Sequence, residues 1–120
     1  MAKQTKMGRR LPKKVNQLSL PKDEYLYLFQ LLKDNEMEKD DSNLWAVTLL
    51  NEARNELLKR MAVEIVDVNS RYKEETKVML TPQRAGVIYW LATHVHSEDA
   101  WQNNVLRQLV WNTHQYLTNL

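Results

Sequence analysis

Residues 43–72 read NLWAVTLLNEARNELLKRMAVEIVDVNSRY, and this stretch decides the fold. Apolar or aromatic side chains recur in it at every third or fourth position: Ala46, Leu50, Ala53, Leu57, Met61, Ile65, Val68 and Tyr72. This period places them on one face of an α-helix. We therefore predict one long helix over 43–72, about 45 Å in length at a rise of about 1.5 Å per residue.

The weak point of this helix is the segment 63–68, where β-branched residues crowd together. Because such side chains favour strands, the alternative is a break there, or a short β-hairpin that turns at Asn69 and Ser70. The sequence leaves open whether residues 63–80 stay helical.

A shorter helix is predicted before the long one, beginning at Pro21 and ending at about Asp34. Its segment 25–32 contains one polar residue, Gln30, so it is apolar on nearly all sides. Such a helix lies at the centre of a bundle or is covered by a partner. An acidic turn, 34–41, follows, and either Asp41 or Ser42 is the expected cap of the long helix.

Two more helices are predicted in the second half of the chain. Thr81 and Pro82 have the residue types of a helix cap and a first helical position. Ser97 is the expected cap of the last helix, which runs nearly to Leu120.

The composition agrees with a helical fold. The chain has 120 residues, of which only two are glycine and three are proline, whereas all-β proteins spend many of both on turns. We therefore predict an all-α protein: a bundle of about four helices, built as two αα-hairpins, in a single domain over 19–120. A flexible basic arm over 1–18 precedes it.

The arm carries most of the positive charge. Six basic residues and no acidic residue lie in 1–14, while the rest of the chain has 11 basic and 15 acidic residues, a net charge of −4. Because cations neutralise phosphates, we expect non-specific nucleic-acid binding by the arm. The alternatives are a solubilising tail and a segment that docks on an acidic protein. The expected nucleic-acid-binding residues are Lys3, Lys6, Arg9, Arg10, Lys13 and Lys14.

Aromatic residues suggest a second contact surface. At 100° per residue, the core stripe of the last helix runs through Trp101, Val105, Leu109 and Thr113, and Trp111 falls nearly opposite it, beside Arg107. Tryptophan and arginine are typical interface anchors. The alternative is that this helix is buried on two sides within the bundle. The expected interface residues are Trp111 and Arg107, with Tyr27 and Phe29 from the apolar first helix.

No motif indicates an enzyme or a cofactor. His94, His96, Glu98 and Asp99 are close in sequence, but residues two apart do not share a helix face, so no metal site is predicted. The chain has no cysteine, which excludes disulfides and thiol catalysis. A deep pocket lined by His94, His96 or Glu64 would favour an enzyme instead.

These observations predict a non-enzymatic assembly or structural protein with no catalytic site and no cofactor. It oligomerises or docks through its aromatic helix faces and contacts nucleic acid through the arm. Small accessory proteins of phages and mobile elements offer an analogy. The alternative is a protein-binding adaptor or inhibitor without a nucleic-acid role. Since no apolar run is long enough to cross a bilayer, we expect no membrane partner and a cytoplasmic location.

Overall fold

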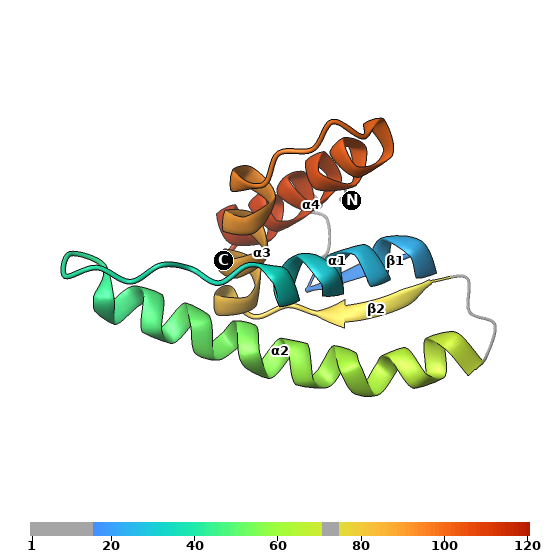
Figure 1. Cartoon of the computed structure of the whole chain (residues 1–120), viewed down its shortest axis with the longest axis horizontal. Helices are drawn as coiled ribbons and strands as arrows, with labels where there is room; N and C mark the ends of the chain where they lie inside the picture. Colours follow the sequence, from blue (N-terminus) through green and yellow to red (C-terminus); the bar gives the residue numbers. More distant parts are fainter. Residues whose placement is uncertain (1–15, 71–74) are drawn as a thin grey trace, which may run out of the picture.

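The computed structural model describes residues 16–70 and 75–120, and nothing is described of the side chains of 66–70. In this part of the chain six elements follow one another (Figure 1). They are β1 (Gln17–Leu20), α1 (Lys22–Asp34), α2 (Leu44–Ser70), β2 (Thr76–Met79), α3 (Pro82–His94) and α4 (Ala100–Thr118).

The predicted four-helix architecture is confirmed. Consecutive helices pack in pairs, α1 with α2 and α3 with α4, and α2 joins the two pairs by packing on α3 (Figure 1). None of the helices in the described ranges is long and apolar enough to cross a bilayer.

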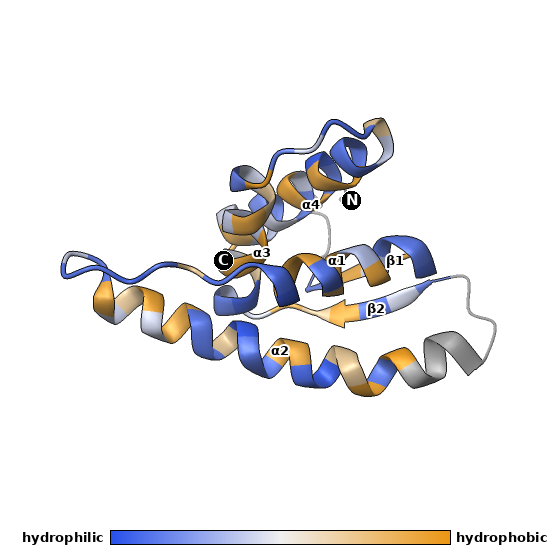
Figure 2. Cartoon of the chain, in the orientation of Figure 1, coloured by the Kyte–Doolittle hydropathy of each residue, from blue (hydrophilic) through white to orange (hydrophobic). Residues whose placement is uncertain are grey.

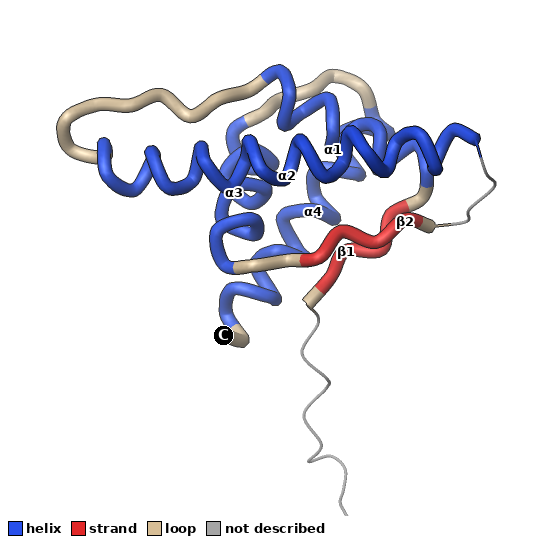
Figure 3. The backbone as a smooth tube through the Cα atoms, turned by 90° about the horizontal axis from the view of Figure 1, so that it is seen from below, coloured by secondary structure: helices blue, strands red, loops and turns tan. Residues whose placement is uncertain are grey.

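The sequence did not predict the small antiparallel sheet formed by β1 and β2. Gln17 pairs with Met79 and Leu20 with Thr76, and the two strands lie side by side at one edge of the helical body (Figure 3). Gln17 and Leu18 therefore belong to the folded body, although the sequence placed them in the arm. The arm residues 1–15 lie outside the described residues.

The long helix α2 is continuous up to Ser70, so the alternative of a break at 63–68 or a hairpin at Asn69 and Ser70 is wrong. The helix penalty of β-branched residues is only a few tenths of a kcal/mol each. Burial of Leu57 and Met61, each 2% exposed, stabilises the preceding turns by about 2 kcal/mol per side chain, and a helix that has formed is extended through the next residues at little further cost. Packing therefore outweighs the local preference for a strand.

The helix starts show where capping rules are reliable. Thr81 caps α3 as predicted, because its side-chain oxygen accepts the N–H of Arg84 at 3.1 Å. The predicted cap of α4, Ser97, is wrong, since Asp99 accepts the N–H of Gln102 at 2.9 Å instead. Ser97 accepts the N–H of Asp99 at 3.0 Å and so shapes the turn before the helix.

Asp40, rather than Asp41 or Ser42, organises the turn before α2. One of its carboxylate oxygens accepts the N–H groups of Ser42 and Asn43 at 2.9 and 3.1 Å. Hydrogen bonds from the side chain and main chain of Ser42 hold the pKa of Asp40 below its ordinary value. The turn thus has a fixed shape built on a charged acceptor.

The hydrophobic core explains why α1 is apolar nearly all round. α1 lies between α2, α3 and β1, so that it has no wide polar face. Every element contributes to the same core, with side chains exposed by 4% or less: Leu18, Leu28, Leu57, Val78, Ile88 and Leu109. The first of the two explanations offered by the sequence, a central helix, is the one that the structure supports.

Candidate functional site

The six basic residues of the predicted nucleic-acid arm, from Lys3 to Lys14, all lie outside the described residues. The structure neither supports nor opposes their role, which stays a prediction. The folded body that follows the arm begins at β1.

Trp111 and Arg107 lie on the outer face of α4. The Trp111 side chain is 64% exposed, and Arg107 is exposed one helical turn before it. The opposite face of α4 is buried through Val105, Leu106 and Leu109. The alternative in which α4 is buried on two sides is therefore wrong.

Around Trp111 the surface of α4 is rich in amides and contains no acidic residue. A shallow hollow on this face is lined by three amides with Arg107 and Trp111. The whole of α4 carries no aspartate or glutamate, and Arg107 is its one arginine. We call the set Asn104, Arg107, Gln108, Trp111 and Asn112 the α4 face. It combines a large apolar ring with donors and acceptors that can bond to a partner.

Tyr27 and Phe29, the other two predicted interface residues, are half-buried. The Tyr27 ring contacts Trp101 edge to face, with 5.6 Å between ring centroids, and Phe29 packs against the core. Much of their apolar surface is therefore used within the chain, and they do not lie in the hollow of the α4 face.

His94 and His96 lie at the end of α3 and in the loop that follows it. The His94 ring stacks on Trp90 at a centroid distance of 4.5 Å, and its Nδ1 lies 2.8 Å from the carbonyl oxygen of Trp90. His96 lines a second shallow hollow between α3 and α4. Within the described ranges, no three histidine or carboxylate side chains come together as metal ligands would.

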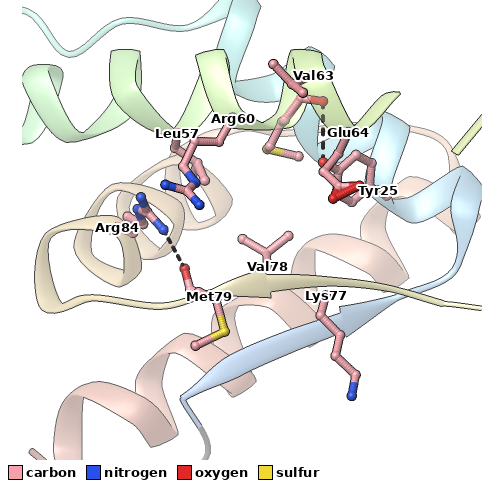
Figure 4. Close-up of a pocket in the computed structure, with 10 residues that line it drawn as sticks. Tyr25, Leu57, Arg60, Val63, Glu64, Lys77, Val78, Met79 and Arg84 are labelled. Atoms are coloured by element: carbon pink, nitrogen blue, oxygen red, sulfur yellow. Dashed lines mark hydrogen bonds between the residues drawn. The ribbon is translucent and has the colours of Figure 1, made fainter. Parts of the chain in front are cut away.

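Sequence reasoning missed a groove between α2 and β2 (Figure 4). Its volume is about 430 Å³, and its walls come from α1, α2, β2 and the first turn of α3. Arg84 lies at one end, where it donates to the carbonyl oxygen of Met79 at 3.1 Å and approaches Glu56 at 3.9 Å. Tyr25 and Glu64 lie at the other end. No sequence signal could have found this groove, because β2 itself was not predicted.

Burial dominates the electrostatics at the Tyr25 end of the groove. Desolvation, with a smaller contribution from the negative charge of Glu64, raises the pKa of Tyr25 to about 12. The phenol therefore stays neutral, and it donates to the carbonyl oxygen of Met61 at 3.4 Å.

A third exposed surface lies at the start of α2. Leu44, Trp45 and Leu49 are 51%, 78% and 41% exposed. In Figure 2 these hydrophobic first turns follow a loop that is hydrophilic along most of its length. Trp45 was not among the predicted interface residues.

Comparisons of this chain with protein-family models, with curated proteins and with solved structures found no match.

Proposed function

We propose that this chain is a non-enzymatic assembly protein of the cytoplasm. In this proposal the α4 face docks on a second copy or on another protein, and the basic arm contacts nucleic acid without sequence preference. A basic arm joined to a helical domain with a docking face is similar, by analogy alone, to small accessory proteins of phages and mobile elements.

The observation that carries the docking role is the exposure of Trp111 beside Arg107. The Trp111 side chain is 64% exposed, so the chain alone gains little hydrophobic free energy from this ring. A partner that covers the ring would remove roughly 100 Å² or more of apolar surface from water. Covered aromatic rings and arginines contribute most of the binding energy in many interfaces. The amides around Trp111 supply the polar rim that such an interface needs.

The charge distribution supports the nucleic-acid role. Six cations fall within the first 14 residues, whereas the rest of the chain has a net charge of −4. The arm contains no aromatic residue that could stack on bases, so binding should depend on phosphates and not on sequence.

Fluorescence anisotropy with random duplex DNA and single-stranded RNA, across a salt series, tests this role. The full chain is compared with a full-length variant in which the six basic residues are glutamine. We expect binding that weakens with salt, with a slope in log K against log salt of up to about −5 if all six cations meet phosphates. The glutamine variant should not bind. If the full chain fails to bind at low salt, the nucleic-acid part of the proposal is wrong.

The exposure of Trp111 beside Arg107 also fits one alternative, a protein-binding adaptor or inhibitor with no nucleic-acid role. In this alternative the arm contacts an acidic protein and not a nucleic acid. In that case the chain binds neither DNA nor RNA in the anisotropy assay, whereas Trp111→Ala still abolishes capture of the protein partner.

A further inference from the structure

The groove between α2 and β2 exposes the main chain of a strand. Lys77, Val78 and Met79 all line it, yet the Lys77 and Met79 side chains point away from α2 (Figure 4). Only Val78 directs its side chain toward the helix. Lys77 and Met79 therefore line the groove chiefly with backbone atoms.

The pairing pattern shows which backbone groups these are. The N–H of Leu80 donates to the carbonyl oxygen of Asn16 at 2.8 Å, so the hydrogen-bonded pairs of the sheet are Leu80 with Asn16 and Val78 with Leu18. Lys77 and Met79 then occupy the alternate positions, where N–H and C=O point away from the partner strand. In the described part of the chain β1 is the one strand beside β2, so this outer edge is unpaired by any strand.

One of the outward groups already has a partner, which confirms their direction. The carbonyl oxygen of Met79 accepts a hydrogen bond from Arg84, whose side chain is 11% exposed and lines the groove. The N–H of Met79 and both backbone groups of Lys77 remain as the pairing positions of the edge.

The side chains around this edge combine apolar surface with positive charge. Leu57 and Met61, each 2% exposed, close the bottom of the groove on α2, and Val63, 74% exposed, supplies the apolar surface at its rim. Arg60, which is exposed, and Arg84 lie near one another at one end (Figure 4). Glu64 lies at the opposite end, so the two arginines gather on one side of the groove.

We propose that this groove binds an extended acidic segment of a partner protein, which adds to the free edge of β2 as a third strand. Its backbone pairs with Lys77 and Met79, an apolar side chain covers Val63, and a carboxylate reaches Arg60 and Arg84. Strand addition of this kind gives affinity through the main chain and specificity through alternate side chains. None of the residues that line the groove belongs to the arm or to the α4 face.

Charge favours an acidic segment as the occupant of this groove. Arg60 and Arg84 lie near one another at one end, and a carboxylate next to two arginines favours association. A second copy of this chain at the same edge is an outcome that the test below distinguishes.

The test uses the full chain, labelled with ¹⁵N, and the blocked hexapeptide VEVEVT as probe. We expect the peptide to slow amide hydrogen exchange at Lys77 and Met79 and to bind about fivefold more weakly to Arg60→Gln, which removes one exposed charge contact. The matched control, Lys59→Gln, changes an exposed cation on the same helix that does not line the groove, and it should bind with unchanged affinity. The peptide VQVQVT should bind more weakly, and VEVEVT with N-methylated amides should not bind.

Three results would overturn the proposal. The first is no binding of VEVEVT at millimolar concentration. The second is equal binding of the N-methylated peptide, because strand pairing would then play no part. The third is protection of Lys77 and Met79 in the chain alone that is lost on dilution, because a second copy would then occupy the edge.

Discussion

The side chain of Asn51 hydrogen-bonds both main-chain groups of Met37. Its side-chain oxygen accepts the N–H of Met37 at 3.3 Å, and its side-chain nitrogen donates to the carbonyl oxygen of Met37 at 3.1 Å. Both residues are buried, at 5% and 7% exposed. One amide on α2 thus takes the place of a neighbouring strand and fixes the extended loop that leads from α1.

Replacing Asn51 with alanine should therefore destabilise the fold. The substitution leaves a buried N–H and a buried C=O without partners, which costs about 2 kcal/mol in the free energy of unfolding. Urea unfolding followed by circular dichroism measures this. Asn112→Ala, on the exposed side of α4, is the control and should change stability by less than about 0.5 kcal/mol. Equal stability of both variants would contradict the role given to Asn51.

Arg54 should be needed for the C-terminal end of α1. Its Nε donates to the carbonyl oxygens of Leu32 at 2.7 Å and Asn35 at 2.6 Å, and the residue is only 9% exposed. The last carbonyls of a helix lack partners within the helix, and a cation there also interacts favourably with the helix dipole.

We expect Arg54→Met to lower the free energy of unfolding by about 3 kcal/mol, since it removes hydrogen bonds from a charged donor. Arg54→Lys should recover only part of this, because an ammonium cannot reproduce the planar fork. Urea unfolding at low and high salt gives the measurement, and the loss should persist in high salt because the site is buried. The exposed Arg60→Met is the control. A loss for Arg54→Met no larger than for that control would refute the capping role.

The helices could be predicted because each carries its signal locally. The apolar residues of 43–72 recur with the helical period of 3.6, and Thr81 and Pro82 are the residue types of a helix start. Both patterns can be recognised without knowing the rest of the chain. The two strands carry no comparable signal. Each has four residues, and Gln17 meets Met79 across more than 60 positions of sequence, so that pairing alone defines them.

The α4 face could be predicted from a local pattern, whereas the groove between α2 and β2 could not. Trp111 lies opposite the core stripe of its own helix, so the helical period alone predicted its exposure. The groove beside Val78 needs a strand and α2 together, so no local pattern could predict it. The cap of α4 failed for a related reason, because Ser97 and Asp99 are both good caps and the path of the turn selects between them.

Stability at alkaline pH should depend on Tyr25. Its pKa is raised to about 12 in the fold from an ordinary value of 10.0. The folded state then keeps a proton that the unfolded chain has lost, so the contribution is present below about pH 10 and is lost as pH rises toward 12. At about 1.4 kcal/mol per pH unit, the loss reaches at most about 3 kcal/mol.

Tyr25→Phe removes this titration while it keeps the ring in the core. At pH 8 we expect the variant to be within about 1 kcal/mol of the natural chain, because the lost hydrogen bond to Met61 is long. Between pH 8 and pH 11 the natural chain should lose more stability than the variant, as measured by urea unfolding at each pH. Parallel losses in the two proteins would show that Tyr25 does not titrate with a raised pKa.

Trp111 and Trp101 lie on the same helix, but alanine substitution should lower association at Trp111 and stability at Trp101. Trp101 is 40% exposed and packs on Tyr27, so Trp101→Ala should cost about 2 kcal/mol of stability through lost burial and a lost aromatic pair. Trp111 faces away from the core, so Trp111→Ala should change stability by less than about 0.5 kcal/mol. Its effect should instead appear in sedimentation velocity or partner capture, as a loss of association. Because both variants remove the same side chain, any non-specific effect of losing a tryptophan is shared between them. A Trp111→Ala chain that associates as the natural chain does would leave the α4 face without a docking role, whatever its stability.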